Sequence, residues 1–203
     1  MKVLLVNGSP RENGCTRTAL DEIAGELNKN GIDTEIFWVG AKAIQGCTAC
    51  LACKKTGKCP YNDGVNTFME KAKTADGFIF GSPVYFASVA GGMKSFMDRL
   101  FFAYKDVFKG KPAAGIVSAR RAGTTVALDE LNKYFLFNQM PIVTSNYWNA
   151  VHGNTPEQVG QDTEGLQTMR ILGNNMAWML KVIEKAGIPF PEADKKIYTN
   201  FIR

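Results

Sequence analysis

Four of the five cysteines in this 203-residue chain lie within thirteen consecutive positions, at a spacing that suits a cluster of metal-binding thiolates. The run reads C-x2-C-x2-C-x5-C-P and contains Cys47, Cys50, Cys53 and Cys59. Ferredoxin-type runs share the first two gaps and the final proline, and four thiolates are the ligand set of a 4Fe-4S cluster. The run therefore predicts that these four residues ligate an iron-sulfur cluster.

Two other interpretations of the cysteine run remain open. Structural zinc more often pairs two C-x2-C units that are a dozen or more residues apart, so zinc ranks second. The other interpretation is that the run binds no metal and its thiols are free or form adventitious disulfides. A structural disulfide framework is disfavoured because we expect a cytoplasmic protein. That expectation rests on residues 1–8, which are too short for a signal peptide, and on the lack of any apolar run near the ~18 residues of a membrane span.

The loop at residues 7–16 follows a short apolar run and leads into a helical pattern, which is a favourable place for an anion. Helix amides, the hydroxyls of Ser9 and Thr16 and the guanidinium of Arg11 are all suitable phosphate donors. The loop matches neither G-x-G-x-x-G nor G-x-x-x-x-G-K-[ST], which disfavours a Rossmann dinucleotide site and a P-loop. The alternative is an ordinary turn with a capped helix.

Two further loops suit a flat heterocyclic ligand. Residues 81–86 combine backbone amides, a proline and two aromatic rings, although aromatic residues more commonly join the core. Residues 118–125 offer amides, hydroxyls and the guanidiniums of Arg120 and Arg121, with a solvated turn as the alternative. Tyr147 and Trp148 are expected to pack in the core, with a place in the lining of a substrate pocket as the alternative. The single histidine, His152, is expected in a loop.

The elements that position these loops follow from hydrophobic periodicity. Short apolar runs predict strands at residues 2–6, 34–39, 77–81, 113–118 and 141–145. Helical stripes predict five helices. The first ends near residue 30, the next three span about 65–72, 93–104 and 125–139, and the last runs from about 162 to 186. This alternation implies right-handed crossovers and a parallel sheet covered by helices on both faces. Ligands of such sheets lie beyond the carboxyl ends of the strands, where the three loops are expected.

Length and composition favour one globular domain over residues 1–203, with a cysteine-rich loop at 40–60. Apolar residues are 45% and charged residues 21% of the chain, which excludes disorder and coiled coil. The net charge of +5 is spread along the chain without a basic stripe, so we expect no nucleic-acid partner and no membrane partner.

Taken together, these features resemble the NADPH-dependent FMN reductases and their iron-sulfur flavoprotein relatives. The resemblance covers nearly the whole chain. It rests on Gly8-Ser9-Pro10-Arg11 with Gly14 and Thr16, Gly81-Ser82-Pro83-Val84-Tyr85-Phe86, Lys94 with Asp98-Arg99, Asp162-Thr163-Glu164-Gly165-Leu166 and Thr199-Asn200-Phe201-Ile202-Arg203. The family's fold is flavodoxin-like, a three-layer α/β sandwich around a five-stranded parallel sheet in the order 2-1-3-4-5.

The resemblance implies that the chain binds FMN. The implied phosphate contacts are Ser9, Arg11, Gly14, Cys15 and Thr16. The implied contacts of the ring are Pro83, Val84, Tyr85 and Phe86. The residue types of the same two loops add Ser82, Ser118, Arg120 and Gly123 as candidate contacts. Relatives often have a glycine-rich loop where this chain has Arg120-Arg121. Cys15 begins a helix whose dipole would lower its thiol pKa, but a role in capping and backbone contact is the favoured interpretation.

The implied function is that of an FMN-dependent oxidoreductase in which the flavin, not a side chain, performs the chemistry. NAD(P)H or a ferredoxin-like donor would supply electrons, in the second case through the 4Fe-4S cluster. The acceptor would be a small molecule such as a flavin, a quinone or an oxygen species, and the resemblance implies a homodimer or homotetramer. The alternatives are a flavodoxin-like electron carrier or redox sensor, which the positive charge disfavours, and a zinc-stabilised binding module.

Overall fold

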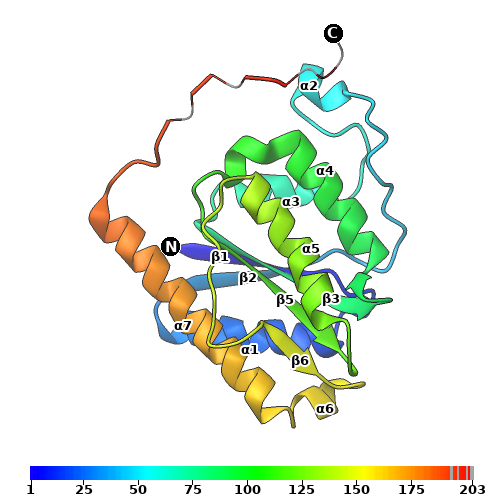
Figure 1. Ribbon diagram of the computed structural model, residues 1–203, viewed down its shortest axis with the longest axis vertical. Helices are drawn as coiled ribbons and strands as arrows, with labels where there is room; N and C mark the ends of the chain where they lie inside the picture. Colours follow the sequence, from blue (N-terminus) through cyan, green and yellow to red (C-terminus); the bar gives the residue numbers. More distant parts are fainter. Residues whose placement is uncertain (193, 196, 200, 202–203) are drawn as a thin grey trace.

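A sheet in the order β2-β1-β3-β5-β6 forms the centre of the computed structural model, which describes residues 1–192, 194–195, 197–199 and 201 (Figure 1). Its parallel strands are β1 (Lys2–Asn7), β2 (Asp33–Trp38), β3 (Gly77–Tyr85), β5 (Ala113–Ala119) and β6 (Ala150–His152). The predicted α/β class is confirmed. The predicted order 2-1-3-4-5 differs by one added strand, β4 (Ser88–Val89), which pairs antiparallel with the end of β3.

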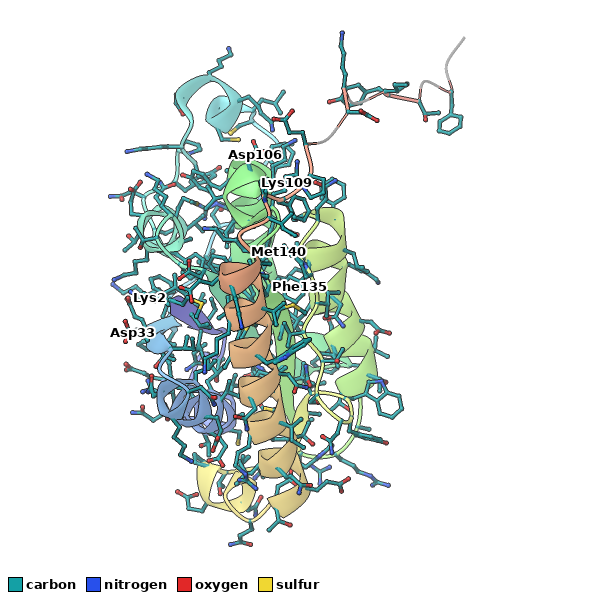
Figure 2. All side chains as sticks on the ribbon, turned by 90° about the vertical axis from the view of Figure 1, so that its left-hand side faces the viewer. Lys2, Asp33, Asp106, Lys109, Phe135 and Met140 are labelled. Atoms are coloured by element: carbon teal, nitrogen blue, oxygen red, sulfur yellow. The ribbon has the colours of Figure 1, made fainter. Side chains whose placement is uncertain are left out.

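Strands β1 and β2 are paired in register from their first residues. Lys2 of β1 is paired with Asp33 of β2, and Figure 2 shows the two residues side by side where their strands begin.

Of the closing motif at residues 199–203, positions 200, 202 and 203 lie outside the described residues.

The strand predicted at residues 141–145 is wrong. Only Ile142 forms a bridge there, with Ala113, before the chain leaves the sheet and returns as β6. In the intervening turn Ser145 Oγ donates to Asn149 Oδ1 at 2.7 Å, and Asn149 Nδ2 donates to the carbonyl of Gly115 at 3.0 Å. Ser145 Oγ also lies 2.7 Å from the Tyr147 carbonyl, so in this turn side chains bond backbone carbonyls, an alternative to strand pairing.

The described residues form seven helices, of which the last two follow the final strand: α1 (Cys15–Lys29), α2 (Ala52–Thr56), α3 (Gly64–Ala72), α4 (Gly91–Phe108), α5 (Thr124–Phe137), α6 (Pro156–Val159) and α7 (Thr163–Ala186). The five longer ones correspond to the predicted helices. The short helices α2 and α6 were not predicted, because four or five residues are too few to show a helical period.

The two faces of the sheet are buried against different helices. Leu4 and Val6 of β1 face the core formed with α3, α4 and α5, whereas Val3 and Leu5 face the core formed with α1 and α7. Because helices cover both faces, the side chains that point to either face of the central strands are apolar. These strands are therefore continuous apolar runs. This arrangement leaves the carboxyl ends of the strands as the place where loops can meet a ligand.

The longest helix, α7, is amphipathic. It buries Met169, Leu172 and Met176 against the sheet, while Trp178 on the other side is exposed. Within the part of the chain that the structure describes, no helix is long and apolar enough to cross a membrane.

Candidate functional site

The loop after β1 is organised by its own side chains. Asn7 is fully buried; its Oδ1 accepts from the Ser9 amide at 3.1 Å and its Nδ2 donates to the Glu12 carbonyl at 2.9 Å. Ser9 Oγ accepts from the Arg11 amide at 3.1 Å, and Trp38 Nε1 donates to the Ser9 carbonyl at 2.8 Å. Asn7 was predicted only as the first residue of this loop and Trp38 only as part of a strand, so the organising role of neither was predicted, although an Asn at a strand end is a signal for such a turn.

This loop leads into a helix whose first turn has no side-chain cap. The N-cap residue of α1 is Gly14, which has no side chain to accept from the first amides. Helix N-termini carry free N–H groups and a partial positive charge that together favour an anion. Arg11 is exposed on the same loop. The predicted phosphate donors therefore surround one helix terminus.

The structure brings the loops after β1, β3 and β5 together. Thr16 Oγ1 lies 2.8 Å from Ser118 Oγ in a buried contact between the start of α1 and the end of β5. The Gly8 amide donates to the Gly81 carbonyl at 2.8 Å, which joins the ends of β1 and β3. The predicted meeting of these segments at one edge of the sheet is thus seen in the structure.

Part of the segment predicted as the second loop is strand. β3 continues through Tyr85, and the turn consists of Phe86 and Ala87, whose φ angles are +51° and +59°. Tyr85 is 48% exposed and Phe86 is fully exposed, so neither ring joins the core. Two aromatic rings held outside the core beside a hairpin turn remain available to cover a ligand.

The third loop contacts this hairpin through a glycine. Gly123 has a φ of +88°, and a Cβ at that position would lie 2.8 Å from Ala87 Cα. Glycine is therefore required both by the left-handed backbone and by the close approach. Arg120 and Arg121 of the same loop are exposed.

A cavity of about 350 Å³ lies beside the third loop, at the carboxyl ends of β5 and β6. Tyr147 and Trp148 line it, with ring centroids 4.5 Å apart, and they are 62% and 53% exposed. The expectation that these two rings pack in the core is wrong. His152 also lines the cavity; it ends β6 instead of lying in a loop, and its Nδ1 is 3.8 Å from Asp162 Oδ2.

Cys15 does not have the lowered pKa that a helix dipole would produce. Burial raises the pKa of its thiol above the ordinary value. Its Sγ lies 3.7 Å from the Gly153 carbonyl, to which it donates. The favoured interpretation, a residue in backbone contact, agrees with this environment.

A larger cavity of about 520 Å³ lies between α4 and α5 and contains a network of polar contacts. Lys94 Nζ is 2.9 Å from a carboxylate oxygen of Glu130, whose other oxygen accepts from Ser88 Oγ at 2.6 Å. Tyr134 accepts from Lys94 at 3.4 Å and donates to Asp98. The network joins the two helices to the β3–β4 hairpin.

This network predicts a loss of stability at alkaline pH. Burial, followed by the hydrogen bond to Asp98, raises the pKa of Tyr134 to about 12, whereas the unfolded value is about 10. A raised folded pKa adds stability that is complete below pH 10 and is lost as pH rises toward 12. Urea unfolding of the wild type and Tyr134→Phe at pH 9 and pH 11 should therefore show a steeper decline for the wild type. Equal declines would contradict the assignment.

The four clustered cysteines are free thiols that line one cavity of about 20 Å³. Cys59 is buried, Cys53 is half-buried, and Cys47 and Cys50 are exposed. The described residues contain no group of three or more His, Cys, Asp or Glu side chains placed to hold a metal ion. The structure thus gathers the four predicted ligands around one small space without directing their sulfur atoms to a common centre.

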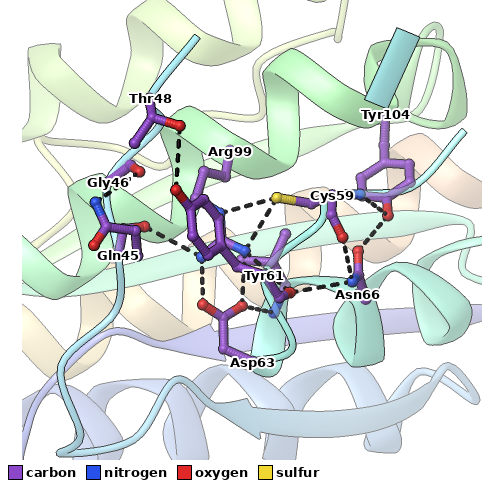
Figure 3. A network of polar contacts seen from close by, with 10 residues as sticks. Gln45, Gly46, Thr48, Cys59, Tyr61, Asp63, Asn66, Arg99 and Tyr104 are labelled. Carbon is purple, nitrogen blue, oxygen red and sulfur yellow. Dashed lines mark hydrogen bonds and ion pairs between the residues drawn. The ribbon is translucent and has the colours of Figure 1, made fainter. Parts of the chain in front are cut away.

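The backbone of this segment has an unusual conformation. Ala49 and Leu51, on either side of Cys50, have φ angles of +52° and +59°. Such values are uncommon for residues other than glycine and occur often at functional sites. On the inner side of the segment, Arg99 of α4 contacts Cys59 (Figure 3). Arg99 was predicted only as part of the motif shared with the family, and its contact with the cysteines was not predicted.

Two iron-sulfur flavoproteins are similar to this chain over most of their length. One from Methanocaldococcus jannaschii is 34% identical over 195 residues, which cover 91% of this chain and 100% of the relative. One from Archaeoglobus fulgidus is 30% identical over 190 residues, covering 88% of this chain and 97% of the relative.

A solved structure and a family model agree with these two relatives. A solved flavodoxin from the domain Archaea superimposes with a TM-score of 0.61 at 17% identity, over 89% of this chain and 99% of the flavodoxin, which confirms the flavodoxin-like fold. The NADPH-dependent FMN reductase family matches this chain over residues 1–155. The chain therefore belongs to the NADPH-dependent FMN reductase family and is a flavoprotein oxidoreductase.

Proposed function

We propose that this chain is an oxidoreductase that holds FMN across the carboxyl ends of β1, β3 and β5. The observation that supports this most directly is the uncapped N-terminus of α1, where Thr16 contacts Ser118 at the end of β5. The loop before α1 reaches the end of β3 through the bond from the Gly8 amide to the Gly81 carbonyl. An anion fits there because it would take the place of the missing side-chain cap. The proposed phosphate contacts are Ser9, Arg11, Gly14, Cys15 and Thr16.

The proposed site for the flavin ring is the surface shared by the β3–β4 hairpin and the third loop. Its contacts are Ser82, Pro83, Val84, Tyr85, Phe86, Ser118, Arg120 and Gly123. The exposed rings of Tyr85 and Phe86 would cover the flat heterocycle and limit its contact with water. Backbone amides of the third loop would orient its polar edge.

Bound FMN would supply both hydride and single-electron chemistry, so the protein need only bind, orient and shield it. We propose NAD(P)H as the donor, which the family name supports. The iron-sulfur relatives support a second route, in which a ferredoxin-like donor acts through a 4Fe-4S cluster held by Cys47, Cys50, Cys53 and Cys59. The four free thiols that line one cavity are the ligand set that a 4Fe-4S cluster requires. The cavity is about 20 Å³ and must widen for a cluster to enter it.

We further propose one domain over residues 1–203 that works in the cytoplasm as a homodimer or homotetramer, with a small acceptor such as a flavin, a quinone or an oxygen species. Exposed apolar side chains on α5 and α7, among them Leu136 and Trp178, support self-association.

The arginines of the third loop predict a modest effect on the flavin. A guanidinium near the ring favours the reduced, anionic form of FMN, and a contribution of ~1.4 kcal/mol corresponds to ~30 mV for a two-electron couple. Because Arg120 and Arg121 are exposed, solvent screening makes ~30 mV an upper limit. Redox titration of Arg120→Gln and Arg121→Gln should show potentials lowered by no more than that. A raised potential, or a much larger drop, would contradict this placement of the ring.

The test of the proposed function is anaerobic mixing of the FMN-loaded protein with NADPH, NADH or reduced ferredoxin. We expect at least one nicotinamide to bleach the flavin absorbance within seconds. Reduction by ferredoxin alone would instead favour the second route, through the cluster, over NAD(P)H as the donor. An FMN that none of the three reduces would contradict an oxidoreductase.

A further inference from the structure

Arg99 is the most completely buried charged residue near the cysteine segment. Its side chain is 1% exposed, although it lies on α4 within the layer of helices that faces solvent. Its Nε and Nη2 donate to the sulfur of Cys59, at 3.2 and 3.1 Å (Figure 3). A buried guanidinium that directs two of its N–H groups to one sulfur atom is a specific arrangement, because burial of an arginine is costly unless its donors are satisfied.

The remaining donors of Arg99 close the two ends of the cysteine segment. Nη1 donates to the carbonyl of Gln45, which precedes the first cysteine, at 3.2 Å. Nη2 donates to the carbonyl of Tyr61, which follows the last cysteine, at 3.4 Å, and both terminal nitrogens bond the carboxylate of Asp63. One side chain therefore holds residues 45 and 61–63 against α4, so that the cysteines lie on a loop closed at its base.

Cys59 is also fixed through its backbone. Its amide donates to Tyr104 Oη at 3.2 Å, and its carbonyl accepts from Asn66 Nδ2 at 2.9 Å. Tyr104 in turn donates to Asn66 (Figure 3). No comparable set of side-chain contacts to Cys47, Cys50 or Cys53 is found in the described part of the chain. The four cysteines are therefore unequal: Cys59 is anchored by side chains of other elements, whereas the other three lack such a set of contacts within the described residues.

We propose that Arg99 is a positioning residue that anchors Cys59 as the fixed ligand of the cluster and raises the reduction potential of that cluster through its two N–H···S hydrogen bonds. The inference rests on the proposed function, since it requires that the cluster exists. Reduction adds one electron to the cluster and places negative charge on its sulfur ligands. Hydrogen bonds to those sulfurs stabilise the reduced form, and the potential of such clusters depends on them.

The test uses two variants that preserve net charge. In the double variant Arg99→Gln/Asp63→Asn the ion pair is removed as a unit, so no carboxylate is left unpaired beside the cysteines. The amide oxygen of an asparagine can also replace Asp63 Oδ1 as the cap that accepts from the Val65 amide at 3.2 Å. Arg99→Lys retains the charge but loses the planar fork that serves Cys59 and Asp63 together. Lys105→Gln, which removes an outward-facing charge from the same helix, is the control.

Each protein is reconstituted anaerobically with iron and sulfide, and its cluster is titrated with dithionite under spectroscopic and potential control. Dithionite supplies the one electron that reduces the oxidised cluster. For the double variant we expect the equilibrium constant for reduction to fall about tenfold, which is about 59 mV for one electron. Arg99→Lys should give a smaller fall, and Lys105→Gln should match the wild type.

The outcomes separate this inference from the function on which it rests. A wild type that takes up no iron contradicts the cluster and the inference together. Clusters that form in all four proteins with equal potentials overturn the role of Arg99 alone. If the two Arg99 variants bind FMN normally but lose iron, the anchoring of Cys59 is supported, because a general loss of fold would also remove the flavin.

Discussion

Replacement of any one of Cys47, Cys50, Cys53 and Cys59 by serine is expected to lower the iron content of the reconstituted protein well below that of the wild type. If a cubane cluster forms on these four thiolates, the wild type should hold about four irons per chain. Serine removes a thiolate ligand with little change in volume. Cys59→Ser should have the largest effect, because Cys59 is the only buried member of the four.

Cys15→Ser is the matched control for this series. Cys15 lies at the start of α1 and does not line the cavity of the other four cysteines. Iron and sulfide assays on the five variants and the wild type, all reconstituted anaerobically, complete the measurement. Stoichiometric zinc without iron uptake by the wild type would favour a structural metal, and iron content independent of all four cysteines would contradict the site.

The second large effect is expected at Arg11. Its exposed guanidinium lies on the loop that leads to the uncapped N-terminus of α1, where the phosphate of FMN is proposed to bind. A hydrogen bond to a charged group contributes about 1.5–3 kcal/mol, and exposure reduces this toward the lower value. Arg11→Ala should therefore weaken FMN binding by about tenfold, measured by fluorescence titration.

Riboflavin lacks the phosphate, so its affinity should be unchanged in Arg11→Ala. Arg17→Ala provides a control on the helix that follows, since Arg17 pairs with Asp21 at 2.8 Å along the surface of α1. Equal weakening of FMN and riboflavin in Arg11→Ala would contradict the placement of the phosphate.

Local patterns were sufficient to predict most of the fold. The apolar runs of β1, β2, β3 and β5 and the stripes of the five longer helices are properties of short windows, and burial on both faces of a parallel sheet makes those patterns strong. The fifth strand was misplaced because the chain leaves the sheet after Ile142 and Asn149 then bonds the carbonyl of Gly115, a distant partner that the local pattern does not contain.

The candidate site was predictable only in part for a similar reason. Glycines, hydroxyls and cysteines at fixed spacing are visible along the chain, whereas burial of a polar side chain depends on distant segments. Arg99 contacts Cys59, which is forty positions away in sequence. Tyr147 and Trp148 are exposed because their segment leaves the sheet, which a short window of sequence also does not reveal. Such long-range contacts have no signature in a short window.

The absorption spectrum of the protein, purified anaerobically and incubated with excess FMN before removal of free ligand, tests the central claim most directly. The arrangement of the loops after β1, β3 and β5 predicts flavin bands that remain with the protein at about one FMN per chain, as expected for one site at the edge of one sheet. A spectrum without protein-bound flavin, from protein whose circular dichroism shows the α/β fold intact, would contradict the assignment of this edge as a flavin site.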